Sequence, residues 1–195
     1  MNLPNKLTIS RIILVPVFTA LFFITAIPCN YVFSAVIFAI AAFTDFLDGY
    51  IARKYNIVTN LGKFLDPIAD KALVSTALII LITSPVAMMG TGVDFTIAFS
   101  CSVALILIRE LGISGFRMVA ASRNLVLAAD KIGKAKTFVT DFAIVFMLVA
   151  LDLSGLAFDI VMYVGYGLFA IGTILTIVSG VNYIVKNKQV LVDEK

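Results

Sequence analysis

Six long apolar runs, separated by short polar segments, constrain this chain more than any other feature of its sequence. We expect helices over residues 7–27, 31–55, 63–83, 94–121, 133–151 and 159–185. Each run has roughly the 20 residues that a helix needs to cross the hydrocarbon core of a bilayer. Apolar residues make up 61% of the 195 residues and the mean hydropathy is +1.07, so a soluble domain of this size is excluded. The sequence therefore predicts one all-α domain over residues 1–195, an integral membrane bundle of six transmembrane helices.

Lysine and arginine are distributed unevenly between the two sides of this predicted bundle. With six spans, both termini and the connections 56–61 and 122–132 lie on one side. The basic residues of that side are Lys6, Arg53, Lys54, Lys63, Arg123, Lys131, Lys186 and Lys188. The connections 28–30, 84–94 and 152–159 contain no lysine or arginine, and we expect a loop over residues 84–93 because of Pro85, Gly90 and Gly92. Since cytoplasmic loops are enriched in lysine and arginine, we expect the basic side to face the cytoplasm.

The counts of histidine and cysteine exclude several kinds of chemistry. The chain contains no histidine, which excludes histidine general bases, zinc–histidine sites and the serine–histidine triad. Its two cysteines, Cys29 and Cys101, are far apart, and Cys101 lies in an apolar run. We therefore expect two small apolar side chains and no structural disulfide.

Four aspartates lie between residues 45 and 70, in the order D-x2-D-G-x2-A-R-x8-G-x3-D-x3-D. Spacings of three and four residues place each pair of carboxylates on one face of a helix. If the two helices face each other, four carboxylates meet, and they repel one another unless a cation or protons neutralise them. Hard divalent cations prefer such oxygen ligands, so the residues predict a metal site of one or two ions. The alternative is that the aspartates cap helix ends, although a cap needs one residue per end rather than two pairs.

A polar stripe opens the first predicted helix. Asn5, Thr8 and Arg11 are three residues apart and therefore share one face of it. In one interpretation Asn5 caps the helix and Arg11 reaches out to phospholipid headgroups. In the other, the stripe faces the metal site and holds a nucleotide.

Two further polar segments interrupt the apolar runs later in the chain. Arg109 and Glu110, followed by Ser114 and Arg117, lie inside the run 94–121. Two guanidinium groups near one helix face suit a phosphate, because each donates two parallel hydrogen bonds, but Arg109 and Glu110 can also be structural, each with a different partner. The segment 131–137, K-I-G-K-A-K-T, lacks the spacing of a phosphate-binding Walker loop. It either contacts anionic lipid or places Lys134 at a helix amino end as a phosphate-binding charge.

On these residues the chain resembles the CDP-alcohol phosphatidyltransferase family. Eight positions match the family signature without a departure in spacing: Asp45, Asp48, Gly49, Ala52, Arg53, Gly62, Asp66 and Asp70. Three further segments, P-N-x-L-T-x-x-R, R-E-L-x-I-S-x-x-R and I-G-K-x-K-T, are similar to the phosphatidylglycerophosphate synthase subgroup of that family. The resemblance therefore covers nearly the whole chain.

The resemblance implies a role for each of these residues. It implies two divalent ions, Mg²⁺ or Mn²⁺, held by Asp45, Asp48, Asp66 and Asp70, with Asp70 also the general base. The residues implied to bind CDP-diacylglycerol are Asn5, Thr8, Arg11, Gly49, Ala52, Arg53 and Gly62. Those implied to bind glycerol-3-phosphate are Arg109, Ser114, Arg117, Lys134 and Lys136. For Gly49 and Gly62, close helix packing is an equal alternative.

The activity that the resemblance implies is transfer of a phosphatidyl group from CDP-diacylglycerol to sn-glycerol-3-phosphate, with release of CMP. It would take place in the bacterial cytoplasmic membrane, in a polar cavity that faces the cytoplasm. We expect membrane lipids and a second copy of the chain as partners, and no nucleic acid. Three alternatives stay open: a sister enzyme that uses inositol phosphate, serine or phosphatidylglycerol, a cation transporter, and a membrane scaffold without catalytic activity.

Overall fold

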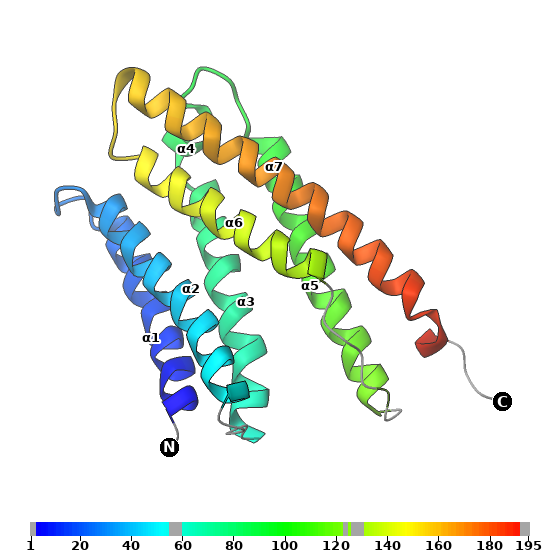
Figure 1. Ribbon diagram of the computed structural model, residues 1–195. Helices are drawn as coiled ribbons and strands as arrows, with labels where there is room; N and C mark the ends of the chain where they lie inside the picture. Colours follow the sequence, from blue (N-terminus) through cyan, green and yellow to red (C-terminus); the bar gives the residue numbers. More distant parts are fainter. Residues whose placement is uncertain (1–2, 55–59, 123–124, 126–130, 192–195) are drawn as a thin grey trace.

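A computed structural model describes residues 3–54, 60–122, 125 and 131–191 of the chain, and this part contains helices and turns but no strand (Figure 1). The helices are α1 (Leu3–Phe23), α2 (Asn30–Lys54), α3 (Asn60–Ile82), α4 (Pro85–Met89), α5 (Thr96–Ser122), α6 (Lys131–Ala150) and α7 (Gly155–Lys186), followed by a short 3₁₀ helix, Lys188–Leu191. The six long helices confirm the all-α prediction, and each one corresponds to one of the six apolar runs.

Local capping explains why some boundaries differ from those predicted. The expected loop over residues 84–93 contains the short helix α4, because the Ser84 side chain accepts the N–H of Ala87 and Pro85 occupies the first helical position. Helix α7 begins at Gly155, four residues earlier than predicted, after a left-handed backbone turn at φ 58° that favours glycine. Helix α1 ends at Phe23, and the amide of Asn30 donates to the carbonyls of its last turn.

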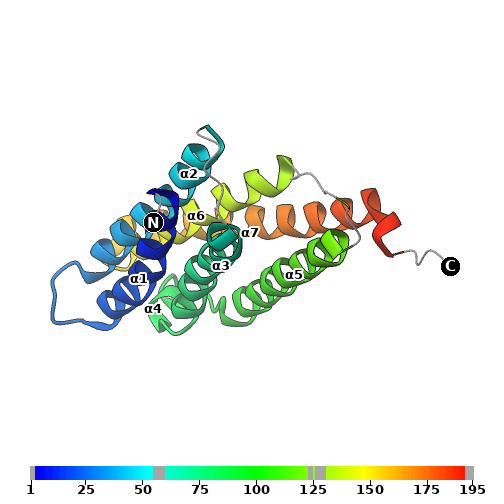
Figure 2. The same cartoon turned by 90° about the horizontal axis from the view of Figure 1, so that it is seen from below.

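The helices form two antiparallel pairs joined through α3 and α5. Helix α1 packs against α2, and α6 packs against α7. Figure 2 shows α3 between the α1–α2 pair and α5, and α3 also contacts α6. The core between them is apolar and includes Phe18, Phe38, Leu78, Ile144 and Met147, none of which is exposed. Packing of this core brings both α2 and α3 into contact with α6.

The outer surface of the bundle is suited to lipid. Among the residues that the structure describes, three helical segments are long and apolar enough to cross a membrane: Asn5–Phe23, Thr96–Ser122 and Gly155–Lys186. Segment Asn30–Asp45 is a shorter apolar helix. Large apolar side chains such as Ile97, Ile108 and Leu156 are more than two-thirds exposed on the outside of the helices. Such a continuous apolar exterior is typical of a membrane-bound protein.

Candidate active site

The polar stripe of α1 faces the interior of the bundle. Asn5, Thr8 and Arg11 are all buried, and Arg11 has no exposed surface. The Arg11 Nη1 atom lies 2.6 Å from Oδ1 of Asp45 on α2, and its Nε donates to the carbonyl of Ala41 at 3.2 Å. Arg11 is thus directed at the first aspartate of the motif and not at the membrane surface, because a buried guanidinium requires a carboxylate partner.

The aspartate motif occupies the facing ends of two helices. Asp45, Asp48, Gly49, Ala52 and Arg53 lie in the last turns of α2, and Gly62, Asp66 and Asp70 lie in the first half of α3. The carboxylates of Asp45 and Asp70 are close enough to repel each other. The side chains of the other six motif residues lie outside the part that the structure describes. Within that part, no group of three or more acidic or cysteine side chains is placed to hold a metal ion, so the predicted four-carboxylate site stays a prediction.

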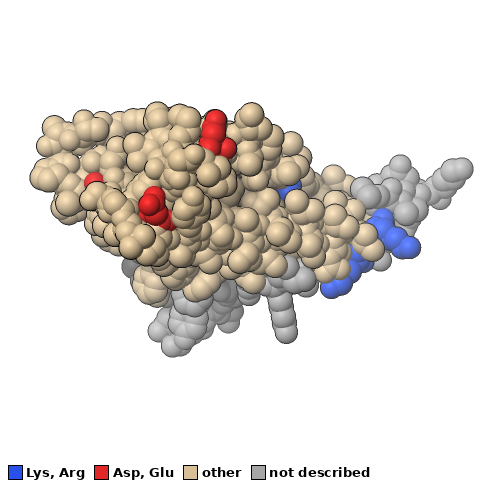
Figure 3. All heavy atoms as spheres, turned by 90° about the horizontal axis from the view of Figure 1, so that it is seen from above, with Lys and Arg blue, Asp and Glu red and all other residues tan. Residues whose placement is uncertain are grey.

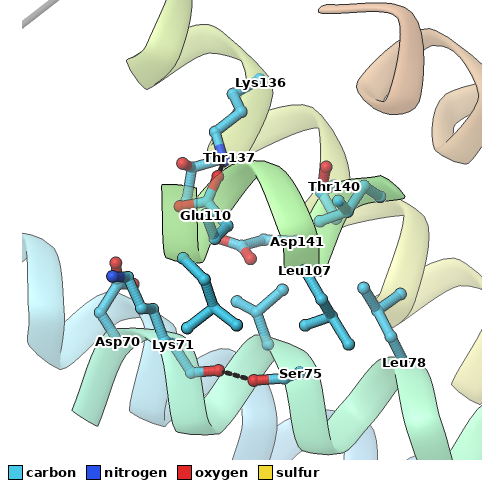
Figure 4. A pocket seen from close by; sticks show the side chains of 13 residues that line it. Asp70, Lys71, Ser75, Leu78, Leu107, Glu110, Lys136, Thr137, Thr140 and Asp141 are labelled. Carbon is cyan, nitrogen blue, oxygen red and sulfur yellow. Dashed lines mark hydrogen bonds and ion pairs between the residues drawn. The ribbon is translucent and has the colours of Figure 1, made fainter. Parts of the chain in front are cut away.

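A cavity of about 230 Å³ lies between α3, α5 and α6, and Asp70 is one of its lining residues (Figure 4). One part of its wall is apolar, formed by Val74, Leu78, Ile106, Leu107 and Leu111. The rest of the wall is polar and is formed by Asp70, Lys71, Ser75, Glu110, Lys136, Thr137, Thr140 and Asp141. A hollow with polar groups gathered on one part of an apolar wall is the usual form of a small-molecule site.

Glu110 joins the two basic segments that the sequence singled out. Its Oε1 accepts from Nη1 of Arg109 at 2.8 Å and also from the Lys136 ammonium group. Lys71, one residue after Asp70, donates to the Ser114 hydroxyl. Arg109 and Glu110 bind each other although they are adjacent on the helix, and each also has a further partner of its own, Ser179 for Arg109 and Lys136 for Glu110.

The two arginines of α5 are directed at α7. Nη2 of Arg109 donates to the Ser179 hydroxyl at 2.9 Å, and Nε of Arg117 donates to the Tyr183 hydroxyl at 3.1 Å. The Arg117 guanidinium also lies 5.3 Å from the centre of the Tyr183 ring. Of the five residues expected to bind glycerol-3-phosphate, Lys136 lines the cavity and Ser114 is bonded to a lining residue. Arg109 and Arg117 do not line it, and the Lys134 side chain lies outside the described part.

Several cavity residues were not singled out from the sequence. They are Lys71, Ser75, Thr140 and Asp141. A usable signal was present, since Lys71 and Ser75, Lys136 and Thr140, and Thr137 and Asp141 are each four residues apart within apolar helices. Polar side chains at such spacings inside a membrane helix line a cavity or meet a partner.

Comparison with known proteins identifies the family. The profile of the CDP-alcohol phosphatidyltransferase family matches residues 1–178, and the chain belongs to that family. A CDP-diacylglycerol–glycerol-3-phosphate 3-phosphatidyltransferase of Bacillus subtilis (strain 168) is 40% identical, over 97% of both chains. A protein of the same name from Rickettsia typhi is 39% identical, over 93% of this chain and 94% of its own. The Arabidopsis thaliana protein with that name and the number 2 is 37% identical, over 97% of this chain and 81% of its own.

Proposed function

We propose that this chain is an enzyme, a single-domain CDP-diacylglycerol–glycerol-3-phosphate 3-phosphatidyltransferase. It transfers a phosphatidyl group from CDP-diacylglycerol to sn-glycerol-3-phosphate and releases CMP. The observation that carries the proposal is the cavity between α3, α5 and α6, because it joins Asp70 of the family motif to the buried Lys136 on α6. Near full-length identity to relatives that bear this name supports the same acceptor.

The reaction is a direct displacement at phosphorus. The acceptor oxygen forms a bond to the phosphorus that carries the diacylglycerol group, while the bond from that phosphorus to the bridging oxygen breaks. CMP leaves with the electron pair, and the carboxylate of Asp70 takes the proton of the attacking hydroxyl. A positioned general base of this kind contributes about 10²- to 10⁴-fold to the rate. Direct attack needs no covalent enzyme intermediate and predicts inversion at phosphorus.

Divalent cations fit the acidic residues of this region. Asp45 and Asp70 come from different helices and their charges repel each other, and a bound cation relieves that repulsion. Carboxylate oxygens are the ligands that Mg²⁺ and Mn²⁺ prefer. Two such ions would be held by Asp45, Asp48, Asp66 and Asp70, and when bound they neutralise negative charge on the diphosphate. Arg11 orients Asp45 from the opposite side.

The substrates occupy neighbouring parts of this region. CDP-diacylglycerol lies along α1, α2 and the start of α3, against Asn5, Thr8, Arg11, Gly49, Ala52, Arg53 and Gly62. The phosphate of glycerol-3-phosphate lies at the polar wall of the cavity, where Lys136 and Ser114 supply donors and Arg109, Arg117 and Lys134 add positive charge nearby. Because Asp70 lines this cavity, we expect the acceptor hydroxyl to lie beside it.

The bundle crosses the bacterial cytoplasmic membrane six times, with the active site toward the cytoplasm. Seen from the end that carries the turns near α4, most of the visible lysine and arginine atoms lie toward one edge, away from the visible acidic atoms (Figure 3). The orientation is supported by the uneven distribution of lysine and arginine between the connections of the two sides. As in the family resemblance, the expected assembly is a homodimer.

A thiol experiment tests this orientation. Cys29 is exposed in the turn between α1 and α2, on the side without lysine or arginine. In a Cys101→Ser background, Cys29 should react with an impermeant maleimide added outside intact cells, and the Cys29→Ser variant should give no signal. Labelling of Cys29 only after the cells are opened would place the active site on the outer side.

Product analysis tests the activity itself. Purified protein is incubated with CDP-diacylglycerol, Mg²⁺ and, in turn, glycerol-3-phosphate, inositol phosphate, serine or phosphatidylglycerol. Mass spectrometry should find phosphatidylglycerophosphate and CMP with glycerol-3-phosphate alone. Product with another acceptor instead would favour a sister enzyme, and no CMP with any acceptor would remove the assignment as an enzyme.

A further inference from the structure

Asp141 on α6 is a cavity residue for which neither the family motif nor the proposed chemistry gives a role. It lines the cavity together with Lys136, Thr137 and Thr140 of the same helix. Its Oδ1 atom is buried and accepts no hydrogen bond from the residues that the structure describes. Figure 4 shows the Asp141 carboxylate directed toward the interior of the cavity, between α5 and α6.

A buried carboxylate oxygen without a donor is costly, and native proteins keep such an atom where a ligand or another group satisfies it. An unprotonated carboxyl oxygen accepts hydrogen bonds and donates none, so the missing partner of Oδ1 must carry an O–H or N–H group. A fully ionised phosphate carries no such group, whereas a hydroxyl does. The missing hydrogen-bond donor for Asp141 Oδ1 is therefore a hydroxyl group of a ligand.

The phosphate and the hydroxyl of an acceptor would be bound at different positions in the cavity. Lys136 and Asp141 are five residues apart on α6, which is about 7.5 Å along the helix axis. Asp70, on α3, lines the same cavity. With its phosphate near the Lys136 ammonium group and its reacting hydroxyl at Asp70, a three-carbon polyol phosphate would present the hydroxyl of its middle carbon to the Asp141 carboxylate.

We propose that Asp141 recognises the second hydroxyl of the acceptor, the one on the middle carbon that does not react. This inference rests on the proposed function and extends it. Asp141 is then a specificity-determining residue that selects polyol phosphates with a free hydroxyl beside the reacting carbon. An acceptor without that hydroxyl leaves Oδ1 unpaired and binds less well.

The test compares two acceptors that differ in this hydroxyl alone. Purified enzyme in mixed micelles with CDP-diacylglycerol is assayed with glycerol-3-phosphate and with 3-hydroxypropyl phosphate. The wild type should prefer glycerol-3-phosphate in kcat/KM by about 10- to 150-fold, the value expected for one hydrogen bond to a charged group. Asp141→Ala should lose this preference by slowing the reaction of glycerol-3-phosphate alone, so that the ratio falls close to one.

Two further variants separate recognition from folding. Asp141→Asn keeps the shape of the side chain and cannot ionise in the buried cavity, so it should melt at or above the wild-type temperature. It should also lower the preference for glycerol-3-phosphate. Asp159→Asn removes the same charge at the start of α7, outside the cavity, and should leave the ratio of the two acceptors unchanged.

Each outcome decides the matter. If the wild type converts glycerol-3-phosphate but Asp141→Ala and Asp141→Asn keep the wild-type preference, the inference is overturned and the proposed function stands. If both variants lose both activities equally and melt well below the wild type, Asp141 is structural and the inference also fails. If the wild type converts neither acceptor, the proposed function fails, and the role of Asp141 fails with it.

Discussion

In the α1–α2–α3 region one buried arginine, Arg11, balances the negative charge of aspartates. In the α5–α6–α7 region one glutamate, Glu110, balances two cations. Arg11 has no exposed surface and binds Asp45. Glu110 accepts from both Arg109 and Lys136. Within the part that the structure describes, Arg11 is thus the buried counter-charge of Asp45, and Glu110 is the carboxylate that Arg109 and Lys136 share.

This contrast shows how charged groups persist in an apolar bundle. A buried charge needs a partner, and one fixed counter-charge holds its neighbours in place without neutralising all of them. The acidic side chains of the first region then suit divalent cations, and the cluster of Arg109, Lys136 and Glu110, with two positive charges to one negative charge, suits a phosphate. The Asp70 end of the cavity is where the two regions meet.

The largest expected effect comes from removing charge in the acidic region. Asp45→Asn, Asp48→Asn and Asp66→Asn should each lower kcat/KM by about 10²- to 10³-fold or more, because each removes an ionised ligand of a hard cation. EDTA should abolish wild-type activity, and Mg²⁺ or Mn²⁺ should restore it. Circular dichroism should show that the variants remain helical. Full activity in EDTA-treated, metal-free protein would leave the acidic region without its proposed role.

Removing the counter-charge of the basic region should have a smaller effect. Glu110→Gln leaves Arg109 and Lys136 close together without their shared carboxylate, so the two cations repel each other. We expect a loss of stability of about 1.5–3 kcal/mol, the value for hydrogen bonds to a charged group. Thermal melting in detergent measures it, with Asp159→Asn as the control for loss of one negative charge. Equal melting temperatures for wild type and Glu110→Gln would show that Glu110 does not hold the two cations.

The smallest expected effect concerns the space that α7 leaves for Arg109. A Cβ atom at Gly180 would lie 3.0 Å from Cγ and 3.3 Å from Nε of Arg109. Gly180→Ala should therefore displace this side chain and destabilise the protein by about 1–3 kcal/mol. Gly167→Ala on the same helix is the matched control, because nothing lies within 4 Å of its added Cβ atom. A similar melting temperature for both variants would show that displacing the Arg109 side chain does not lower the stability of the protein.

The long-range organisation was predictable from the sequence because it depends on length and polarity. Six apolar runs predicted six long helices, and a 26-residue motif predicted that Asp45 and Asp70 lie near each other. Helix α4 and the start of α7 were missed, since the first depends on a single cap at Ser84 and the second on the left-handed backbone of Gly155. Such caps are local and compete with the surrounding apolar pattern.

The cavity was less predictable, because it is formed by residues that are near in space and far apart in the chain. The sequence singled out Arg109 and Arg117 for their charge, and it contained no sign that α7 would supply Ser179 and Tyr183 as their partners. Asp141 was overlooked because a single carboxylate in an apolar helix matches no motif. Its position becomes meaningful only when α3, α5 and α6 are placed together.

Steady-state kinetics of Asp70→Asn and Lys136→Ala tests most directly the claim that the acidic region performs the chemistry and the basic region holds the acceptor phosphate. Asp70→Asn should lower kcat by about 10²- to 10⁴-fold and leave both KM values near those of the wild type. Lys136→Ala should raise the KM for glycerol-3-phosphate by about 10- to 150-fold, with little change for CDP-diacylglycerol, and Arg117→Ala and Lys134→Ala should act in the same direction. The account is contradicted if Lys136→Ala, Arg117→Ala and Lys134→Ala all leave the KM for glycerol-3-phosphate unchanged, or if Asp70→Asn alters that KM alone.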